Sequence, residues 1–188
     1  IASPIIDNWT LLKLSQGFPP YFKSATLSLL FEPYKKANSL EQALEKLFQK
    51  ALHLVKLGVK SIILSDRGIN KEKAPIPILL ALSGLHHRLI KEGKRGHIGL
   101  IVETGAARLV HHMAVLIGYG ASAINPYLAL ETIEVYSQEK NCEASLPELQ
   151  KNYMKSLNTG ILKKIGRAHV WTPVTVPYLV CRLLLEKK

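Results

Sequence analysis

The stretch that decides the fold is GLIVETGAARLVHHMAVLIGYGASAINPYLALET, residues Gly99–Thr132. It begins within a short apolar run, Ile98–Val102, which predicts a buried strand. A helical pattern over Ala107–Ile117 follows, then a short strand over Ala121–Ile124 and a helix over Leu128–Ser137. Strands that alternate with helices across short connections predict a parallel sheet joined by right-handed crossovers.

The same alternation extends towards the N-terminus. The expected elements are a strand over Ser24–Phe31, a helix from the N-cap Ser39 to Gly58, a strand over Ser61–Ser65 and a helix over Pro75–Gly93. The buried face of that last helix is expected to contain Leu79, Leu82, Leu85, Leu89 and Ile90. Residues 1–23 are proline-rich and are expected to be irregular. Four strand–helix units are about half of an eight-unit barrel. The predicted class is therefore α/β, a partial (half) β/α barrel of about four units with parallel strands, although a doubly wound sheet also fits.

Polar residues follow three of the expected strands. They are Asp66-Arg67-Gly68, Glu103-Thr104-Gly105 and Asn125-Pro126-Tyr127. In parallel α/β folds, chemistry gathers at this carboxyl end of the strands. Two acids near an arginine predict an ion-paired cluster or a substrate clamp. The structural alternative is that Asp66 and Glu103 cap the following helices and pair with Arg67 or Arg108.

Two adjacent histidine pairs, His86-His87 and His111-His112, lie on two of the expected helices. Neighbouring positions on a helix point about 100° apart, so an adjacent pair does not converge on one metal ion. No H-E-x-x-H spacing accompanies them. We expect no metal site, with one histidine of each pair at a helix interface and the other in solvent or on a carbonyl.

The net charge of the chain is +11, from 25 basic and 14 acidic residues. Such a charge raises nucleic acid as a partner. The lysines are spread singly over expected helix faces, however, as at Lys46, Lys50 and Lys56, without an arginine-rich stripe. Solvated helix surfaces explain this pattern, so no nucleic acid partner is expected. No apolar run reaches the roughly 18–20 residues of a membrane span, so no membrane partner is expected either.

The residues themselves reveal no complete active site. Gly118-Tyr119-Gly120 precedes a strand, whereas a dinucleotide-binding glycine motif follows one. Cys142 and Cys181 fit a reducing compartment and offer neither a disulfide framework nor a metal knuckle. Cys142, in a polar loop, is expected to be incidental.

Several stretches resemble the large subunit of glutamate synthase. They are Phe22–Phe31, Ile62–Arg67 with Ala74–Arg95, Gly99–Thr132, and Lys151–Lys164. The stretch Gly99–Thr132 is the most specific, with a glutamate–Thr–Gly turn, an arginine, a histidine pair, a Gly-Tyr-Gly break and a strand ending in Asn-Pro-Tyr. Ala106 departs from the family, which usually carries an acidic or polar residue there.

In that family, the large subunit consists of a glutaminase domain, a central domain, an FMN and iron–sulfur synthase domain, and a β-helix. Ammonia from glutamine passes through a tunnel to 2-oxoglutarate, and FMN reduces the resulting iminoglutarate to glutamate. The resemblance implies that residues 1–140 are the later half of the central domain. Residues 141–164 would be a linker and the first helix of the FMN domain, opening at Ser145. The implied parent is an oxidoreductase of the bacterial cytoplasm or a plastid.

The resemblance assigns no catalytic, cofactor-binding or metal-binding residue to this chain, because the family's glutaminase cysteine lies upstream and its flavin and cluster ligands lie downstream. FMN and iron–sulfur clusters would belong to the parent. The implied partners are the glutaminase and FMN domains of the same parent chain and a small reductase subunit. Candidate interface, tunnel or structural residues are Asp66, Arg67, Glu103, Arg108, His111, His112 and Asn125. The electron donor, whether ferredoxin, NADPH or NADH, is not determined by these residues.

The resemblance stops at Ile165. Ile165–Thr175 (IGRAHVWTPVT) looks like a common sequencing adapter translated in one frame, with a UGA codon read as Trp171. Leu179–Lys188 (LVCRLLLEKK) looks like the far end of that adapter. We therefore expect residues 165–188 to be foreign to the protein; the alternative is a genuine amphipathic C-terminal helix. The absence of an initiating Met likewise leads us to expect a piece of a longer chain.

Two other functions compete with this interpretation. An autonomous β/α-barrel flavoprotein oxidoreductase predicts a yellow protein, and a basic nucleic-acid-binding domain predicts steeply salt-dependent binding. A half barrel also leaves open strand edges and uncovered apolar surface. The isolated chain is therefore expected to be poorly soluble or partly molten.

Overall fold

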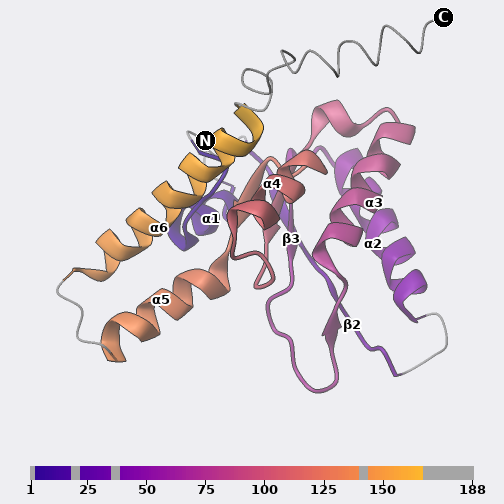
Figure 1. Ribbon diagram of the computed structural model, residues 1–188. Coiled ribbons are helices and arrows are strands. Elements are labelled where there is room, and N and C mark those ends of the chain that lie inside the picture. Colours follow the sequence, from indigo (N-terminus) through magenta and orange to yellow (C-terminus); the bar gives the residue numbers. More distant parts are fainter. Residues whose placement is uncertain (1–2, 18–21, 35–38, 140–143, 167–188) are drawn as a thin grey trace, which may run out of the picture.

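The computed structural model describes residues 3–17, 22–34, 39–139 and 144–166 (Figure 1). The larger elements are α1 (Asn8–Ser15), β1 (Ser24–Ser28), α2 (Ser39–Lys56), β3 (Ser61–Ser65), α3 (Ile78–Lys91), β5 (Gly99–Glu103), α4 (Val110–Gly118), β6 (Ala123–Asn125), α5 (Tyr127–Glu139) and α6 (Leu146–Ile161). The shorter ones are β2 (Leu30–Phe31), β4 (Ala74–Pro75), the 3₁₀ turn η1 (Arg95–His97) and the π-helical turn η2 (Leu162–Gly166). The expected alternation of strand and helix is confirmed.

The four main strands form one parallel sheet in the order β1-β3-β5-β6. Each main strand therefore pairs with the next one along the chain. A doubly wound sheet reverses its strand order at a switch point, whereas a β/α barrel keeps the order sequential. The sequential order and the flanking helices are those of a partial β/α barrel, so the predicted fold class is confirmed.

The two faces of the sheet have different coverings, because alternate residues of a strand point to opposite faces. The outer face contributes Ile62, Leu64, Leu100, Val102 and Ile124 to the large core, which also contains the buried residues of α2, α3, α4 and α6. The inner face contributes Ile63, Ile101 and Ala123 to a smaller cluster with Ile6 and Leu11. The helix α1 therefore lies where the interior of a closed barrel would be.

The prediction that residues 1–23 are irregular was wrong. Ile5 forms a parallel bridge with Ile124, and the N–H of Ile6 donates to the carbonyl of Ile124 at 2.9 Å, so the N-terminal segment covers the outer edge of β6. The helix α1 then begins after Asp7, whose carboxylate accepts a hydrogen bond from the N–H of Thr10 at 2.7 Å. An N-cap aspartate before a leucine-rich segment is a sequence signal for a helix, and proline content concealed it.

One strand and one helix have boundaries that differ from the prediction. The expected strand Ser24–Phe31 is split into β1 and β2, and β2 pairs antiparallel with β4. Because Pro75 and Pro77 favour extended backbone for the residues before them, α3 begins at Ile78 rather than Pro75. The predicted buried residues Leu79 and Ile90 are 37% and 51% exposed, since the buried face of α3 runs through Ala81, Leu82, Leu85 and Leu89.

The C-terminal part of the described chain forms a helical pair. Figure 1 shows α5 and α6 side by side, and α6 also lies against α4. Ser145 is the N-cap residue of α6, as predicted, and the helix ends at Ile161, where η2 takes over. The expected foreign tail lies outside the described residues from residue 167 onward. Among the described helices, none combines the length and apolar character needed to cross a membrane.

Candidate functional site

The strand register places one polar residue of each main strand in a single row on the inner face. Ser28 is in register with Ser65, Ser65 with Glu103, and Glu103 with Asn125. This row lies at the carboxyl end of the sheet. Ser65, Glu103 and Asn125 are buried there. Because buried polar groups need hydrogen-bond partners, the partners of this row and of the residues just beyond it define the candidate site.

Asp66, which follows β3, ties its own strand to the turn after β5. It is 4% exposed, and its carboxylate accepts hydrogen bonds from the hydroxyl of Thr104 at 2.5 Å and the N–H of Gly105 at 3.1 Å. The backbone adds a further link, because the N–H of Asp66 donates to the carbonyl of Glu103. Asp66 therefore caps the turn of a neighbouring strand. This corrects the alternative in which Asp66 caps the helix that follows its own strand.

Arg67 joins two acidic side chains from different elements. Its Nε donates to Oε1 of Glu103 at 2.5 Å, and its Nη1 donates to Oε1 of Glu131 on α5 at 2.8 Å. Its guanidinium carbon lies 4.0 Å from the centre of the Tyr127 ring, which is a cation–π distance. Burial by itself lowers the pKa of Arg67, but the hydrogen bonds and charges of Glu103 and Glu131 leave that pKa above its ordinary value. Of the two acids expected near this arginine, Glu103 pairs with it, whereas Asp66 bonds to Thr104 and Gly105 instead.

Tyr127 and Glu131 complete what we call the strand-end cluster: Asp66, Arg67, Glu103, Tyr127 and Glu131. Burial raises the pKa of Tyr127 to about 12, and the charge and hydrogen bonding of Asp66 add to this shift. The phenol therefore stays protonated beside the carboxylate. Tyr127 was expected only as a polar residue after a strand, and Glu131 was not among the predicted site residues. Their i,i+4 spacing on the helix after Asn125-Pro126 places both on one face and would have been the signal.

Asn125, the last residue of β6, connects the cluster to α1. It is completely buried, and its Nδ2 donates to the carbonyl of Ile6 at 3.1 Å and to Oδ1 of Asn8 at 2.9 Å. Its own Oδ1 is buried and accepts no hydrogen bond from the described residues. Asn125 therefore holds the start of α1 against the sheet, and Asn8 is a second residue that sequence analysis missed.

A cavity of about 330 Å³ lies between part of α1 and the inner face of the sheet, beside the packing of Leu11 on that face. Its lining consists of Asn8, Leu11, Leu12, Ser15, Thr26, Ile63, Arg67 and Glu103. We call it the inner cavity. The volume lies at the lower end of the range for small-molecule pockets. Its two charged lining residues, Arg67 and Glu103, pair with each other, so the charged end of this cavity is neutralised within itself.

Arg108, His111 and His112 lie apart from this cluster, in the first turns of α4 and just before it. The N–H of Arg108 donates to Nδ1 of His112 at 3.3 Å, and the carbonyl of Arg108 accepts from the hydroxyl of Tyr153 at 2.9 Å. His111 Nδ1 lies 3.3 Å from Nζ of Lys164. Burial raises the pKa of Tyr153. Arg108 and His111 thus link the start of α4 to α6 and η2, whereas the contact of His112 stays within its own turn. The predicted candidate set therefore divides into two separate groups.

The other histidine pair explains the Gly-Tyr-Gly break. Nε of Arg95 donates to Nδ1 of His86 at 2.9 Å, while its Nη2 donates to the carbonyl of Gly120 at 2.7 Å. Burial, with the charges of Arg95 and His87, lowers the pKa of His86, which suits a neutral acceptor. His87 is exposed, so this pair divides between interface and solvent as predicted. Within the described ranges, no group of three or more His, Cys, Asp or Glu side chains is placed to hold a metal ion.

The sequential parallel sheet, with its helix on the inner face and its charges paired with one another, defines a partial β/α-barrel domain. Comparison with known proteins identifies the family to which this domain belongs. The chain belongs to the glutamate synthase central domain family, whose model matches residues 1–172. That match extends past Lys164, where the resemblance was expected to stop.

Three relatives illustrate the similarity. The chain is 39% identical over 172 residues to the glutamate synthase (NADPH) large chain of Bacillus subtilis, with 92% of this chain and 11% of the relative covered. It is 40% identical over 186 residues to the ferredoxin-dependent glutamate synthase of Cyanidium caldarium, with 89% and 12% covered. It is 32% identical over 169 residues to the glutamate synthase (NADH) of Schizosaccharomyces pombe, with 89% and 8% covered. The chain thus spans about one tenth of the length of these relatives.

Proposed function

We propose that this chain is a connecting part of a flavin-dependent glutamate synthase, the oxidoreductase that converts L-glutamine, 2-oxoglutarate and a reductant into two molecules of L-glutamate. In this proposal, the segment links the glutaminase and FMN synthase domains and lines their interface and the ammonia path. It contributes no catalytic residue of its own. Membership of the central domain family carries the proposal.

The strand-end cluster supports a positioning role rather than a catalytic one. Arg67 is paired with both Glu103 and Glu131, and Asp66 is hydrogen-bonded to Thr104 and Gly105. These charged groups therefore already have partners within the chain. The inner cavity borders that cluster. Because its two charged lining residues neutralise each other, the cavity offers no unpaired cation to the anionic substrates glutamate and 2-oxoglutarate, and a small neutral molecule such as ammonia suits it better.

Cofactors, partners and location follow from the same proposal. FMN and iron–sulfur clusters belong to the parent and lie outside this chain, and the partners are the glutaminase and FMN domains of the parent chain with a small reductase subunit. The parent is placed in the bacterial cytoplasm or in a plastid. The relatives named above carry NADPH, NADH and ferredoxin in their names, so family membership leaves the electron donor undetermined.

The domain boundaries belong to the proposal as well. Residues 1–140 form the later half of the central domain, residues 141–164 the linker and first helix of the FMN domain, and residues 165–188 are foreign. Sequencing the genomic DNA across codon 165 tests the last boundary. We expect native codons that differ from Ile165–Thr175, and an uninterrupted genomic match to the tail would remove this part of the proposal.

The coupling of the two half-reactions tests the functional role. In an intact homologue, the changes equivalent to Arg67→Ala and Glu103→Gln are expected to leave glutamine hydrolysis active. They should lower the ratio of glutamate formed to glutamine hydrolysed, because the cluster no longer positions the strand ends beside the ammonia path. Lys56→Ala, on the exposed end of α2, is the matched control. Unchanged coupling in both cluster variants would reject an interface or tunnel role.

A further inference from the structure

The outer edge of β1 is open within the part of the chain that the structure describes. The strand β1 is at one end of the sheet, and its only partner strand among the described residues is β3. At the opposite end, the bridge between Ile5 and Ile124 covers β6. The side chains of β3 are buried throughout, whereas Thr26 and Ser28 of β1 are exposed. The two ends of the sheet therefore differ, and among the described residues only the β6 end has a covering segment.

The hydrogen bonds of β1 show which backbone groups face this edge. The carbonyl of Lys23 accepts from the N–H of Ser61, and the N–H of Leu29 donates to the carbonyl of Ser65. In a parallel pair, the residues whose backbone groups face the neighbouring strand alternate along the strand. The odd-numbered residues of β1 therefore face β3. The N–H and C=O groups of Thr26 and Ser28 face the open edge, where they form a template for another strand.

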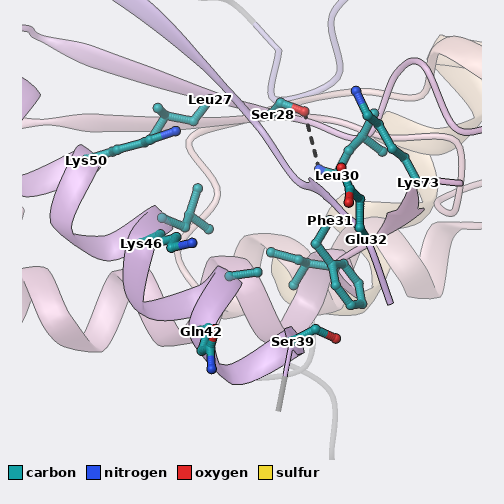
Figure 2. A pocket seen from close by; sticks show the side chains of 13 residues that line it. Leu27, Ser28, Leu30, Phe31, Glu32, Ser39, Gln42, Lys46, Lys50 and Lys73 are labelled. Carbon is teal, nitrogen blue, oxygen red and sulfur yellow. Dashed lines mark hydrogen bonds between the residues drawn. The ribbon is translucent and has the colours of Figure 1, made fainter. Parts of the chain in front are cut away.

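Two cavities flank this edge, one on each face of the sheet. The inner cavity reaches Thr26 from the side of α1. A larger cavity of about 650 Å³, which we call the outer groove, lies between β1–β2 and α2, as Figure 2 shows. Leu27 lies on its floor. Successive side chains of an added strand point to opposite faces, so a strand paired with β1 would direct them alternately into the inner cavity and the outer groove.

The charge of the outer groove indicates the chemistry of the strand. Lys46 and Lys50 lie one turn apart on α2 and border the groove in Figure 2, and Lys73 approaches it from the side of β4. Among the described lining residues, these three lysines stand against one acidic residue, Glu32. The groove also contains Leu27 and Phe31, so it combines an apolar floor with a basic rim. A second copy of the chain, with its own basic rim, would be repelled.

We propose that the β1 edge binds an extended acidic segment of the glutamate synthase large chain that lies outside these 188 residues. The segment adds to the sheet as a further strand and directs acidic side chains to Lys46 and Lys50. This mode of binding takes its affinity from main-chain hydrogen bonds and its selectivity from the side-chain pockets. The source of the segment rests on the proposed function, because it treats the chain as one part of a longer polypeptide.

The probe is a synthetic seven-residue peptide in which glutamate alternates with valine. It is added in excess to the 188-residue chain, held below the concentration at which the chain aggregates, and binding is followed by amide hydrogen exchange and fluorescence anisotropy. We expect saturable binding that protects the amides of Thr26 and Ser28. Two N-methylated peptides, blocked at alternate amides of opposite parity, form a matched pair that leaves the protein unchanged. One parity should weaken binding by about tenfold or more, and the other should bind as the parent peptide does.

Protein variants test the edge and the charge separately. Thr26→Pro removes an N–H that faces the open edge, and an edge strand tolerates proline at such a position. This variant should abolish peptide binding, while Thr26→Val should retain it. Lys46→Glu with Lys50→Glu should weaken binding about five- to tenfold, while Lys56→Glu, outside the groove, should leave it within twofold.

Three outcomes would overturn the inference: no binding of the acidic peptide, equal binding of both N-methylated peptides, or equal binding of a lysine–valine peptide. A discrete dimer that Thr26→Pro abolishes and that excess acidic peptide does not dissociate would assign the edge to a second copy and reject the proposed occupant. These readouts do not depend on glutamine hydrolysis. A coupling defect in the Arg67 variant without any peptide response would therefore retain the proposed function and reject this inference alone.

Discussion

Gly120 shows how one residue serves the packing of two distant segments. Its φ angle is +104°, a backbone conformation that residues other than glycine rarely adopt. A Cβ placed on this residue would lie 2.2 Å from Nδ1 of His86. The same histidine ring accepts from Arg95, whose guanidinium also bonds to the carbonyls of Ile98 and Gly120. The Gly-Tyr-Gly break thus exists for the contact with α3, and no ligand is needed to explain it.

Gly120→Ala is therefore expected to lower the free energy of unfolding by about 2–4 kcal/mol, from backbone strain together with the clash. Gly118→Ala is the matched control. Gly118 is the last residue of α4, and a Cβ added to it has no neighbour within 4 Å, so this substitution should cause no loss of stability. Urea denaturation of the three proteins measures this difference. Equal stability of both variants would mean that His86 does not occupy the space above Gly120.

Tyr127 makes stability depend on pH at the alkaline end. Burial and the Asp66 carboxylate raise its pKa to about 12, whereas an unfolded tyrosine has a pKa of about 10. Between these values the unfolded chain releases the proton and the folded chain keeps it. Rising pH therefore favours unfolding by up to about 2 kcal/mol from this residue.

The free energy of unfolding of the Tyr127→Phe variant should fall less steeply between pH 10 and 12 than that of the parent chain, because phenylalanine has no proton to release. Tyr136→Phe, at an exposed position on α5, should follow the parent chain. Urea denaturation at several pH values compares the three slopes. A Tyr127→Phe slope equal to that of the parent would show that the phenol is not held protonated by its surroundings.

At the residue scale, the sequence predicted which side chains would gather but not how they would bond. Asp66, Arg67, Glu103 and Asn125 were found because parallel strands end at a common edge. Glu131 and Asn8 were missed because their partners, Arg67 and Asn125, are 64 and 117 positions away along the chain. Arg108 was in the candidate set as a possible partner of Asp66 or Glu103, yet its backbone carbonyl accepts a hydrogen bond from Tyr153 on α6.

At the scale of elements, α1 covers the inner face of the sheet. Leu11 is 7% exposed against Ile63 and Ile101, while the adjacent Leu12 is 46% exposed. The helix has eight residues, too few for independent stability, so its packing on the sheet must hold it in place. Asn125 and the Asp7 cap provide the polar part of that attachment.

Leu11→Ala should cost about 2–3 kcal/mol of stability, because it removes the side chain that fills the space beside Ile63. Leu12→Ala, one position along the same helix, should cost less than about 1 kcal/mol. Chemical denaturation combined with hydrogen exchange of α1 measures both. Equal costs at the two positions would indicate that α1 does not pack on the inner face.

The described molecule exposes apolar side chains and an unpaired strand edge. Leu79, Leu80 and Leu109 are 37%, 45% and 63% exposed, and the edge of β1 has the open backbone groups described above. Such surfaces promote association when nothing covers them. The large chains of this family contain about nine tenths of their length beyond the matched part.

At the scale of the whole molecule, we therefore expect the isolated chain to be poorly soluble or partly molten. Size-exclusion chromatography should show aggregated or heterogeneous material, and thermal unfolding should be broad. Truncation after Lys164 removes the expected foreign tail and should not reduce the stability of the remainder. A monomeric elution profile with a sharp cooperative melt would contradict the first expectation, and a lower melting temperature after truncation would contradict the second.

The sequence by itself determined the class of fold, because apolar strand-length runs alternate with amphipathic helices and each pattern is local. It also determined the family, through the continuous stretch from Gly99 to Thr132. Only the tertiary structure decided that the strands are in sequential order, that Ile5 pairs with β6 while α1 covers the inner face, and that Arg67 is shared between Glu103 and Glu131. These features depend on contacts between residues far apart along the chain, and local patterns do not specify which distant groups meet.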